Sequence, residues 1–338
     1  MMADPSEGQE LRTDRQGTRR FPTAGEDSAH SRLDPNTPQT TSPAYRLGFA
    51  DPDFLLRDEL RAARLELEFL KPDLLQRDRG IVATIAVFGS ARIPAPENVA
   101  ALLEEAELAA ARDPANLLLV RDLRRIRSLV EKARYYEEAR RLARMIAESQ
   151  AESPDAGQGS ASAPRPQGAA EQPADACRLY HGPASVVVVT GGGPGIMEAA
   201  NRGAHDVDRD NIGLNIVLPR EQAPNPYITP HLCFNFHYYA LRKMHFLMRA
   251  VALVVFPGGY GTLDELFELL TLIQTGKIEP MPVLLFGREY WERIIDFQAL
   301  VDEGMIGPED LQIFAYVETA EEAWRHLQPV LATVREQT

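Results

Sequence analysis

The chain of 338 residues is 44% hydrophobic and 25% charged, an ordinary globular composition that supplies enough apolar side chains for a sizeable core. Lys and Arg number 36 against 49 Asp and Glu. The resulting formal net charge of −13 has the wrong sign for a protein that mainly neutralises a nucleic-acid backbone. Cys177 and Cys233 belong to no CxxC or Cys/His cluster, so neither a disulfide framework nor a zinc site is indicated.

The N-terminal part of the chain has the composition of a tail. Residues 1–44 are rich in Pro, Ser, Thr, Gly and charge without an apolar period, which predicts disorder. They lack the apolar core of a signal peptide, and no run in the chain approaches the roughly 18 apolar residues of a membrane span. We therefore expect a cytoplasmic protein without a membrane partner.

A mainly helical region comes next. Apolar spacing predicts helices over 53–70 and over 97–148, with a break near Asp113-Pro114, and the second group is expected to pack on the core. Residues 151–176 then return to a Pro-, Gly- and Ala-rich composition. Because strands are expected on both sides of this stretch, we interpret it as an insertion in a single domain over 45–338.

The rest of the pattern alternates strands with helices. Continuous apolar runs rich in β-branched residues predict strands at 81–90, 185–193, 211–219, 251–259 and 281–287. Helices are expected at 196–206, 237–249, 262–275 and 289–303. This order predicts an α/β protein with a Rossmann-like doubly wound parallel sheet in three α/β/α layers, and with extra helices toward the N-terminus.

Three of the predicted strands end in loops of small residues, at 88–92, 191–195 and 257–262, which we call the glycine loops. Glycine lets backbone amides approach a phosphate at the start of a helix, where the helix dipole also favours an anion. The candidate ligand-binding positions in these loops are Gly89, Ser90, Gly192, Gly193, Gly195, Gly258, Gly259, Gly261 and Thr262. One such loop could be only a tight turn, but three at one sheet edge favour a phosphorylated ligand.

Two other phosphate-binding readings fit less well. The sequence GGGPG is not GxGxxG, and the next strand ends at Pro219 without an acidic residue for a ribose diol, which disfavours NAD. Neither GGGPG nor PGGYG ends in GK[ST], as a nucleoside triphosphatase would require. His231, His237 and His245 lack HExxH spacing, so no metal and no cofactor are indicated.

Four segments resemble the Lonely Guy (LOG) family, whose members were long labelled lysine decarboxylases. They are GGGPGIMEAANRGA (191–204), LPREQAPNPYI (218–228), RKMHF (242–246) and PGGYGTLDELFE (257–268). The resemblance covers about residues 80–330. Within the family, the chain is similar to the longer bacterial branch described as AMP nucleosidase. It implies hydrolysis of a nucleoside 5′-monophosphate to free base and ribose 5-phosphate, and a homodimer or higher homo-oligomer with the site near the subunit interface.

The resemblance also selects individual residues. It places the family's catalytic arginine at Arg242 and its catalytic glutamate at Glu265, with Lys243 and Glu221 as substrate-binding residues. A fixed carboxylate can stabilise the positive charge that develops on ribose, or orient the attacking water, and Arg242 is expected to keep Glu265 ionised by direct contact. Without the resemblance, Asp264 and Glu265 would be equivalent acids at a helix start.

We expect AMP as the substrate, with N6-substituted adenine nucleotides (cytokinin precursors) as a second candidate. The alternative is a non-catalytic protein that binds a nucleotide or another phosphorylated ligand on the same fold. A pyridoxal-dependent decarboxylase is the weakest option, because Lys243 is the sole lysine near the loops.

Overall fold

The computed structural model describes residues 21–31, 36–150, 185–219 and 223–337. The predicted insertion at 151–176 lies outside these ranges. The chain divides into two units, Met1–Leu67 and Glu68–Thr338. The predicted boundary between a tail and a single domain therefore stays a prediction.

In the first unit, the described residues form short helices. They are α1 (Ala24–Ser31), α2 (Pro52–Leu55) and 3₁₀ turns at Pro43–Tyr45, Gly48–Ala50 and Asp58–Leu60, before α3 (Arg61–Asp78) begins. The predicted helix 53–70 is wrong in its bounds, since α3 continues through Pro72. That proline is buried and lacks the amide hydrogen of one helical hydrogen bond, while its carbonyl accepts from Gln76 Nε2 at 3.0 Å.

In the described part of the second unit, seven parallel strands form one sheet in the order β4-β3-β2-β1-β5-β6-β7. Their bounds are β1 Ile81–Phe88, β2 Ser185–Thr190, β3 Asn211–Ile216, β4 Cys233–Phe236, β5 Ala250–Val255, β6 Val283–Phe286 and β7 Phe314–Val317. The strand order reverses between β1 and β5, the place where an open parallel sheet forms a binding crevice. The predicted doubly wound sheet is confirmed, with β4 and β7 as two strands that the prediction omitted.

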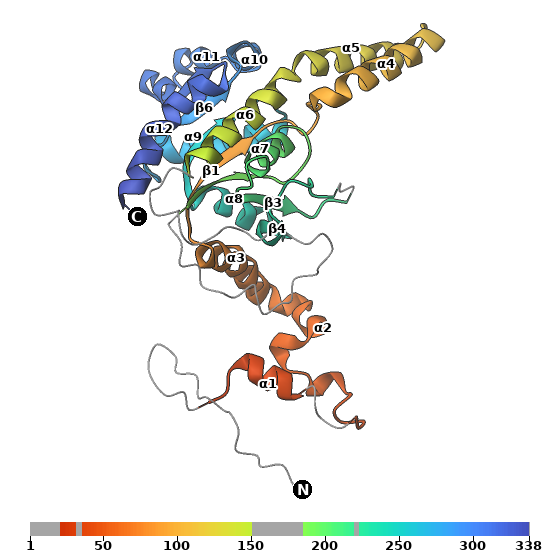
Figure 1. Cartoon of the computed structure of the whole chain (residues 1–338), viewed down its shortest axis with the longest axis vertical. Coiled ribbons are helices and arrows are strands. Elements are labelled where there is room, and N and C mark those ends of the chain that lie inside the picture. The colour runs from red at the N-terminus through yellow and green to blue at the C-terminus, as the bar shows by residue number, and fades with distance from the viewer. Residues whose placement is uncertain (1–20, 32–35, 151–184, 220–222, 338) are drawn as a thin grey trace. The chain divides into compact units, whose positions relative to one another are not determined.

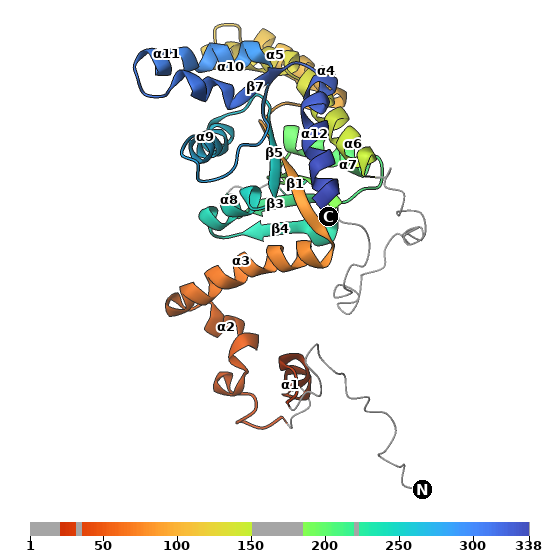
Figure 2. The same ribbon diagram turned by 90° about the vertical axis from the view of Figure 1, so that its left-hand side faces the viewer.

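Helices cover both faces of this sheet (Figures 1 and 2). Their bounds are α4 Pro96–Arg112, α5 Leu117–Glu131, α6 Arg134–Ser149, α7 Ile196–His205, α8 Tyr239–Leu247, α9 Tyr260–Gln274, α10 Arg288–Ile294, α11 Phe297–Asp302 and α12 Ala320–Gln337. One core cluster joins the sheet to α6, α7 and α12, and a second joins its other face to α8, α9, α10 and α11. The three-layer architecture is therefore confirmed.

The helices before the insertion pack differently from the prediction. α4 and α5 run side by side (Figure 1), and no residue of α5 is buried. The expected packing of this group on the core holds for α6, seven of whose residues are buried, but is wrong for α5. The apolar stripe of α5 instead meets α4, so both helices stay largely exposed.

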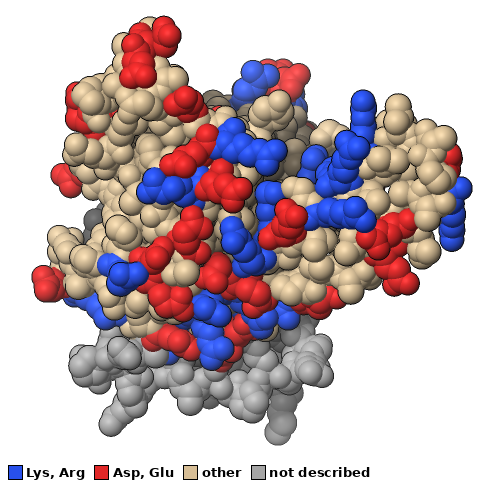
Figure 3. Space-filling view, turned by 90° about the horizontal axis from the view of Figure 1, so that it is seen from above, with Lys and Arg blue, Asp and Glu red and all other residues tan. Residues whose placement is uncertain are grey.

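The surface mixes both signs of charge. On the face shown in Figure 3, Lys and Arg lie among Asp and Glu rather than in a separate field. In the described part of the chain, no helix is both long and apolar enough to span a bilayer.

Candidate functional site

The glycine loops meet at the carboxyl ends of β1, β2 and β5. Ser90 N donates to Pro257 O at 3.0 Å, and Ile196 N donates to Ser90 O at 3.2 Å. β1 and β5 are the neighbours between which the strand order reverses. The three predicted loops therefore share one edge of the sheet, at its topological switch point.

Glycines in these loops meet two different requirements. Gly192 and Gly195 have φ values of 75° and 72°, and a Cβ at either position would lie within 2.4 Å of Asn215 or Ser90. The backbone itself therefore demands glycine there. A Cβ at Gly259 or Gly261, in contrast, would meet no atom within 4 Å. Internal packing does not explain the glycines at these two positions, whereas the approach of a ligand to the start of α9 would.

The start of α9 has the features of an anion site. Gly259 is its N-cap residue, without a side-chain cap, and the first amides of an α-helix have no partner within the helix. The Tyr290 hydroxyl on α10 donates to Gly258 O at 2.5 Å and so restrains the third glycine loop. Thr262, in the first turn, is buried with 6% exposure.

A buried amide network holds the second glycine loop in place. Asn225 Nδ2 lies 3.2 Å from Gly192 O, 3.1 Å from Gly193 O and 2.9 Å from Asn201 Oδ1. Asn201 accepts from Thr190 Oγ1 at 2.7 Å. The amides thus tie α7, β2 and the segment after β3 to one loop conformation.

The network was not predicted from the sequence, although it left a signal. Asn211 and Asn215 are polar residues inside the apolar run of β3, and both are buried. A buried amide requires partners, so asparagines in a buried strand could have pointed to a polar cluster.

Arg242 is anchored to the sheet by α8. Its Nε donates to Leu214 O at 2.7 Å, and its Nη2 lies 3.5 Å from Gly191 O. The guanidinium carbon lies 5.2 Å from the centre of the Phe246 ring. Burial lowers the pKa of Arg242 below its ordinary value, although nearby Tyr239 and Glu265 oppose the shift.

Glu265 is a buried carboxyl in the second turn of α9, with 6% exposure. Burial raises its pKa from an ordinary 4.5 to about 7, against the lowering effect of Lys243 and Arg242. The neighbouring carboxylates Glu268 and Asp264 raise it further. A carboxyl with a pKa near neutrality is suited to proton transfer at physiological pH.

The expected direct contact between Arg242 and Glu265 is wrong. Among the ion pairs of the described residues, none within 4.0 Å joins these two groups, because the guanidinium turns to the backbone carbonyls of Leu214 and Gly191. Lys243 makes the direct link to α9 instead, with its Nζ 2.9 Å from Asp264 Oδ2 and 2.9 Å from Glu268 Oε2.

These two ion pairs also set the charge of Lys243. Burial alone would lower its pKa, but hydrogen bonds to Glu268 and Asp264 outweigh that effect and raise it above the ordinary value. Arg242 and Lys243 therefore act on Glu265 as nearby positive charges rather than as bonded partners.

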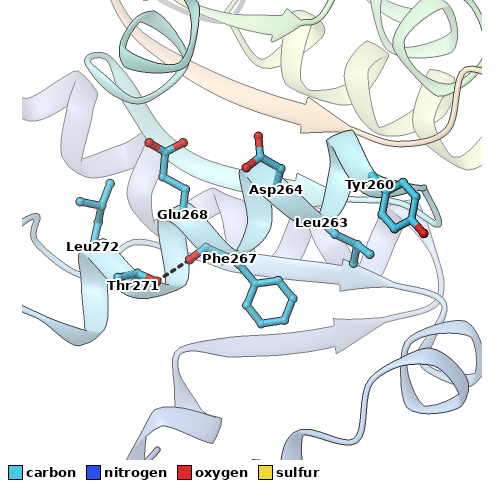
Figure 4. Close-up of a pocket in the computed structure, with 7 residues that line it drawn as sticks. All are labelled: Tyr260, Leu263, Asp264, Phe267, Glu268, Thr271 and Leu272. Atoms are coloured by element: carbon cyan, nitrogen blue, oxygen red, sulfur yellow. Dashed lines mark hydrogen bonds between the residues drawn. The ribbon is translucent and has the colours of Figure 1, made fainter. Parts of the chain in front are cut away.

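A groove runs along the outer side of α9. It is lined by Tyr260, Leu263, Asp264, Phe267, Glu268, Thr271 and Leu272. In Figure 4 the carboxylates of Asp264 and Glu268 point to one side of the helix, and Leu263 and Phe267 point to the other. The side chain of Tyr260 is 93% exposed at the helix start. The groove thus borders the site but contains neither Arg242 nor Glu265.

Two further observations concern residues that could hold a ligand. Glu221 lies outside the described residues, so its expected role in substrate binding stays a prediction. Within the described ranges, no three His, Cys, Asp or Glu side chains gather as they would to hold a metal ion. His245 is instead buried between the rings of Phe69 and Phe236.

Comparison with known proteins identifies the family of the chain. The family described as "Possible lysine decarboxylase" matches residues 197–327, a range that includes Arg242, Lys243, Thr262 and Glu265. Cytokinin riboside 5'-monophosphate phosphoribohydrolase LOG3 of Arabidopsis thaliana is 32% identical over 146 residues, which cover 42% of this chain and 66% of LOG3. LOG1 of the same plant is 30% identical over 146 residues, covering 42% of this chain and 67% of LOG1. The chain belongs to the LOG family.

The matches to LOG relatives are partial on both sides. The chain spans 66% of the length of LOG3, just under two thirds. Among solved structures, a molybdenum-cofactor (Moco) carrier protein from Chlamydomonas reinhardtii is similar with a TM-score of 0.37 and 16% identity, covering 74% of this chain and 98% of that one. Residues before 197, including the first glycine loop and α3, lie outside the matched family range.

Proposed function

We propose that this LOG-family protein is a phosphoribohydrolase that cleaves the N-glycosidic bond of a nucleoside 5′-monophosphate and releases free base and ribose 5-phosphate. The observation that carries the proposal is Glu265, a buried carboxyl whose pKa is raised to about 7 between the glycine loops and two cations. The LOG relatives are named for this reaction on cytokinin riboside 5'-monophosphates. AMP is the proposed substrate here, with N6-substituted adenine nucleotides as the second candidate.

The phosphate is held by the first turn of α9. Gly259 and Gly261 leave its amides open to a ligand, and the helix dipole favours the negative charge. Binding energy from the phosphate can then be used at the ribose, where the bond breaks. This arrangement predicts a preference for nucleotides over nucleosides.

Glu265 acts in its ionised form at the ribose. As the bond between C1′ and the base nitrogen breaks, its electron pair leaves with the base, and positive charge develops on the sugar ring. The carboxylate stabilises this charge and takes a proton from the water whose oxygen bonds to C1′. The departing base takes up a proton from solvent, so atoms and charge balance. Arg242 and Lys243 lower the pKa of Glu265 and so increase its ionised fraction.

The proposed assembly is a homodimer or a higher homo-oligomer. Apolar side chains on α8 and α9 support it, since Tyr239, Met244, Met248 and Phe267 are 49%, 48%, 43% and 38% exposed. Large exposed apolar side chains are candidates for contacts with another protein chain. Light scattering coupled to size-exclusion chromatography would test this, with a monomeric mass as the contradicting result. A cytoplasmic location stays a prediction from composition.

The experiment that tests the proposed function compares AMP with adenosine. Chromatography should detect adenine released from AMP and far less from adenosine, because adenosine lacks the phosphate that the α9 amides bind. Equal turnover of both would refute the anchoring role of the loops. Tight nucleotide binding without any base release would instead favour the non-catalytic alternative.

A further inference from the structure

The catalytic helix α8 begins without a cap of its own. Its N-cap residue, Tyr238, makes no side-chain cap hydrogen bond, and the helix is only nine residues long. Isolated helices shorter than about 12 residues are marginal in water, so tertiary contacts must hold α8 in place. Arg242 and Lys243 lie in the middle of this helix.

The missing cap is supplied by Glu68 from α3. Its Oε1 accepts from His237 N at 2.7 Å, and its Oε2 accepts from Tyr238 N at 3.1 Å. The donors are 169 and 170 residues away in the chain. A carboxylate at this position satisfies two unpaired amides and also complements the positive end of the helix dipole.

The same face of α3 holds the other end of α8. Arg249, two residues beyond the helix, donates from Nη2 to Asp73 Oδ1 at 2.6 Å. Between these polar contacts, the Phe69 ring lies 5.5 Å from the buried His245 ring. Glu68, Phe69 and Asp73 thus contact the residues at the start of α8, its last turn and the segment just after it, and we call them the α3 clamp.

The clamp affects the chemistry through charge positions. Arg242 and Lys243 both lower the pKa of Glu265, and their effect depends on how near α8 brings them. If the start of α8 frays, the backbone that carries both cations loses one constraint, and only their side-chain bonds to the sheet and to α9 still hold them. The acid on α9 then becomes harder to ionise, and the fraction of active carboxylate at neutral pH falls.

We propose that Glu68 is a positioning residue of the active site, which caps α8 and thereby fixes Arg242 and Lys243 opposite Glu265. The inference rests on the proposed function, but α3 lies outside the matched family range of 197–327. The LOG motifs therefore do not assign this role. Glu68 is also the first residue of the second unit, so the clamp is internal to that unit.

The test uses the full chain with Glu68→Ala and Glu68→Gln. The control is Glu66→Ala, which removes an exposed carboxylate two residues away on the same helix. Base release from AMP is measured from about pH 5.5 to about pH 8.5. Hydrogen exchange of peptides covering 237–249 is followed in the same proteins. Glu68→Gln keeps one acceptor oxygen without the charge, so it tests the role even if Glu68→Ala folds poorly.

Glu68→Ala should lower kcat severalfold at neutral pH, because a smaller fraction of Glu265 is then ionised. The acidic limb of its pH–rate profile should move to higher pH, and the α8 amides should exchange faster. Glu68→Gln should recover part of each effect, and Glu66→Ala should match wild type.

The positioning role would be overturned if Glu68→Ala left both the acidic limb of the pH–rate profile and the hydrogen exchange of the α8 amides unchanged. It would also be overturned if the variant had a lower melting temperature but the same acidic limb. A wild-type chain that releases no base overturns the proposed function instead. The exchange measurement needs no turnover and still decides whether Glu68 caps α8.

Discussion

Replacing Glu265 with glutamine should remove activity and stabilise the fold. Burial raises the pKa of Glu265 from 4.5 to about 7, so the folded protein binds this proton more tightly than the unfolded chain. The resulting stability is complete below the unfolded pKa of 4.5 and is lost as pH rises through about 7. A shift of this size corresponds to at most about 3 kcal/mol, which relaxation of the site reduces to about 1–2 kcal/mol.

The amide cannot ionise, so Glu265→Gln should not suffer this loss at alkaline pH. We expect equal stability of variant and wild type near pH 4, and a melting temperature that is a few degrees higher for the variant near pH 8. kcat should fall by about 10²–10⁴-fold, the usual contribution of a general base. Nucleotide binding, measured by calorimetry, should be largely retained.

The matched control is Asp264→Asn on the same helix. Asp264 is 53% exposed and shares Lys243 with Glu268, so its loss should cost at most about 1 kcal/mol and spare kcat. Wild-type activity in Glu265→Gln with an inactive Asp264→Asn would move the catalytic carboxylate by one position. A stability difference that does not grow with pH would refute the burial argument.

Four further substitutions test the site. Arg242→Ala should raise KM for AMP and lower kcat, each by about tenfold or more, because the proposed role of the guanidinium is to contact the substrate and to favour the ionised form of Glu265. Unchanged kinetic constants would contradict this role. Gly261→Ala should raise KM without changing the melting temperature, because the added Cβ meets no protein atom within 4 Å. Gly195→Ala should instead unfold the loop, because φ is +72° and the added Cβ would lie 2.4 Å from a backbone oxygen. Asn225→Ala should lower the free energy of unfolding by about 1–3 kcal/mol in a denaturant titration, because Gly193 O and Asn201 Oδ1 each lose a donor while Gly192 O keeps the backbone amide of residue 225. An unchanged midpoint would count against the network.

The central sheet could be predicted because its strands are long apolar runs. The run at 81–90 becomes β1, whose residues are buried except Val82. β4 and β7 have only four residues each and lie at the two edges, so their patterns were too short to separate from loops. The predicted helix 289–303 is divided because Asp296 caps α11, with its side chain accepting from Ala299 N.

The site was predictable only where local motifs carried it. The glycine loops precede helices along the chain, so their shared edge follows from the strand–helix order. Glu68 reaches α8 across 169 residues and Asn225 reaches Gly192 across 33, and no local pattern encodes such pairs. The orientation of Arg242 toward backbone carbonyls likewise depends on which groups the fold brings near it.

The most direct test of the proposed reaction is product analysis with AMP. The account predicts adenine and ribose 5-phosphate in equal amounts from wild type, with both products lost together in Glu265→Gln. Release of adenosine and inorganic phosphate, or no product from any nucleoside monophosphate in a panel of bases, would contradict it.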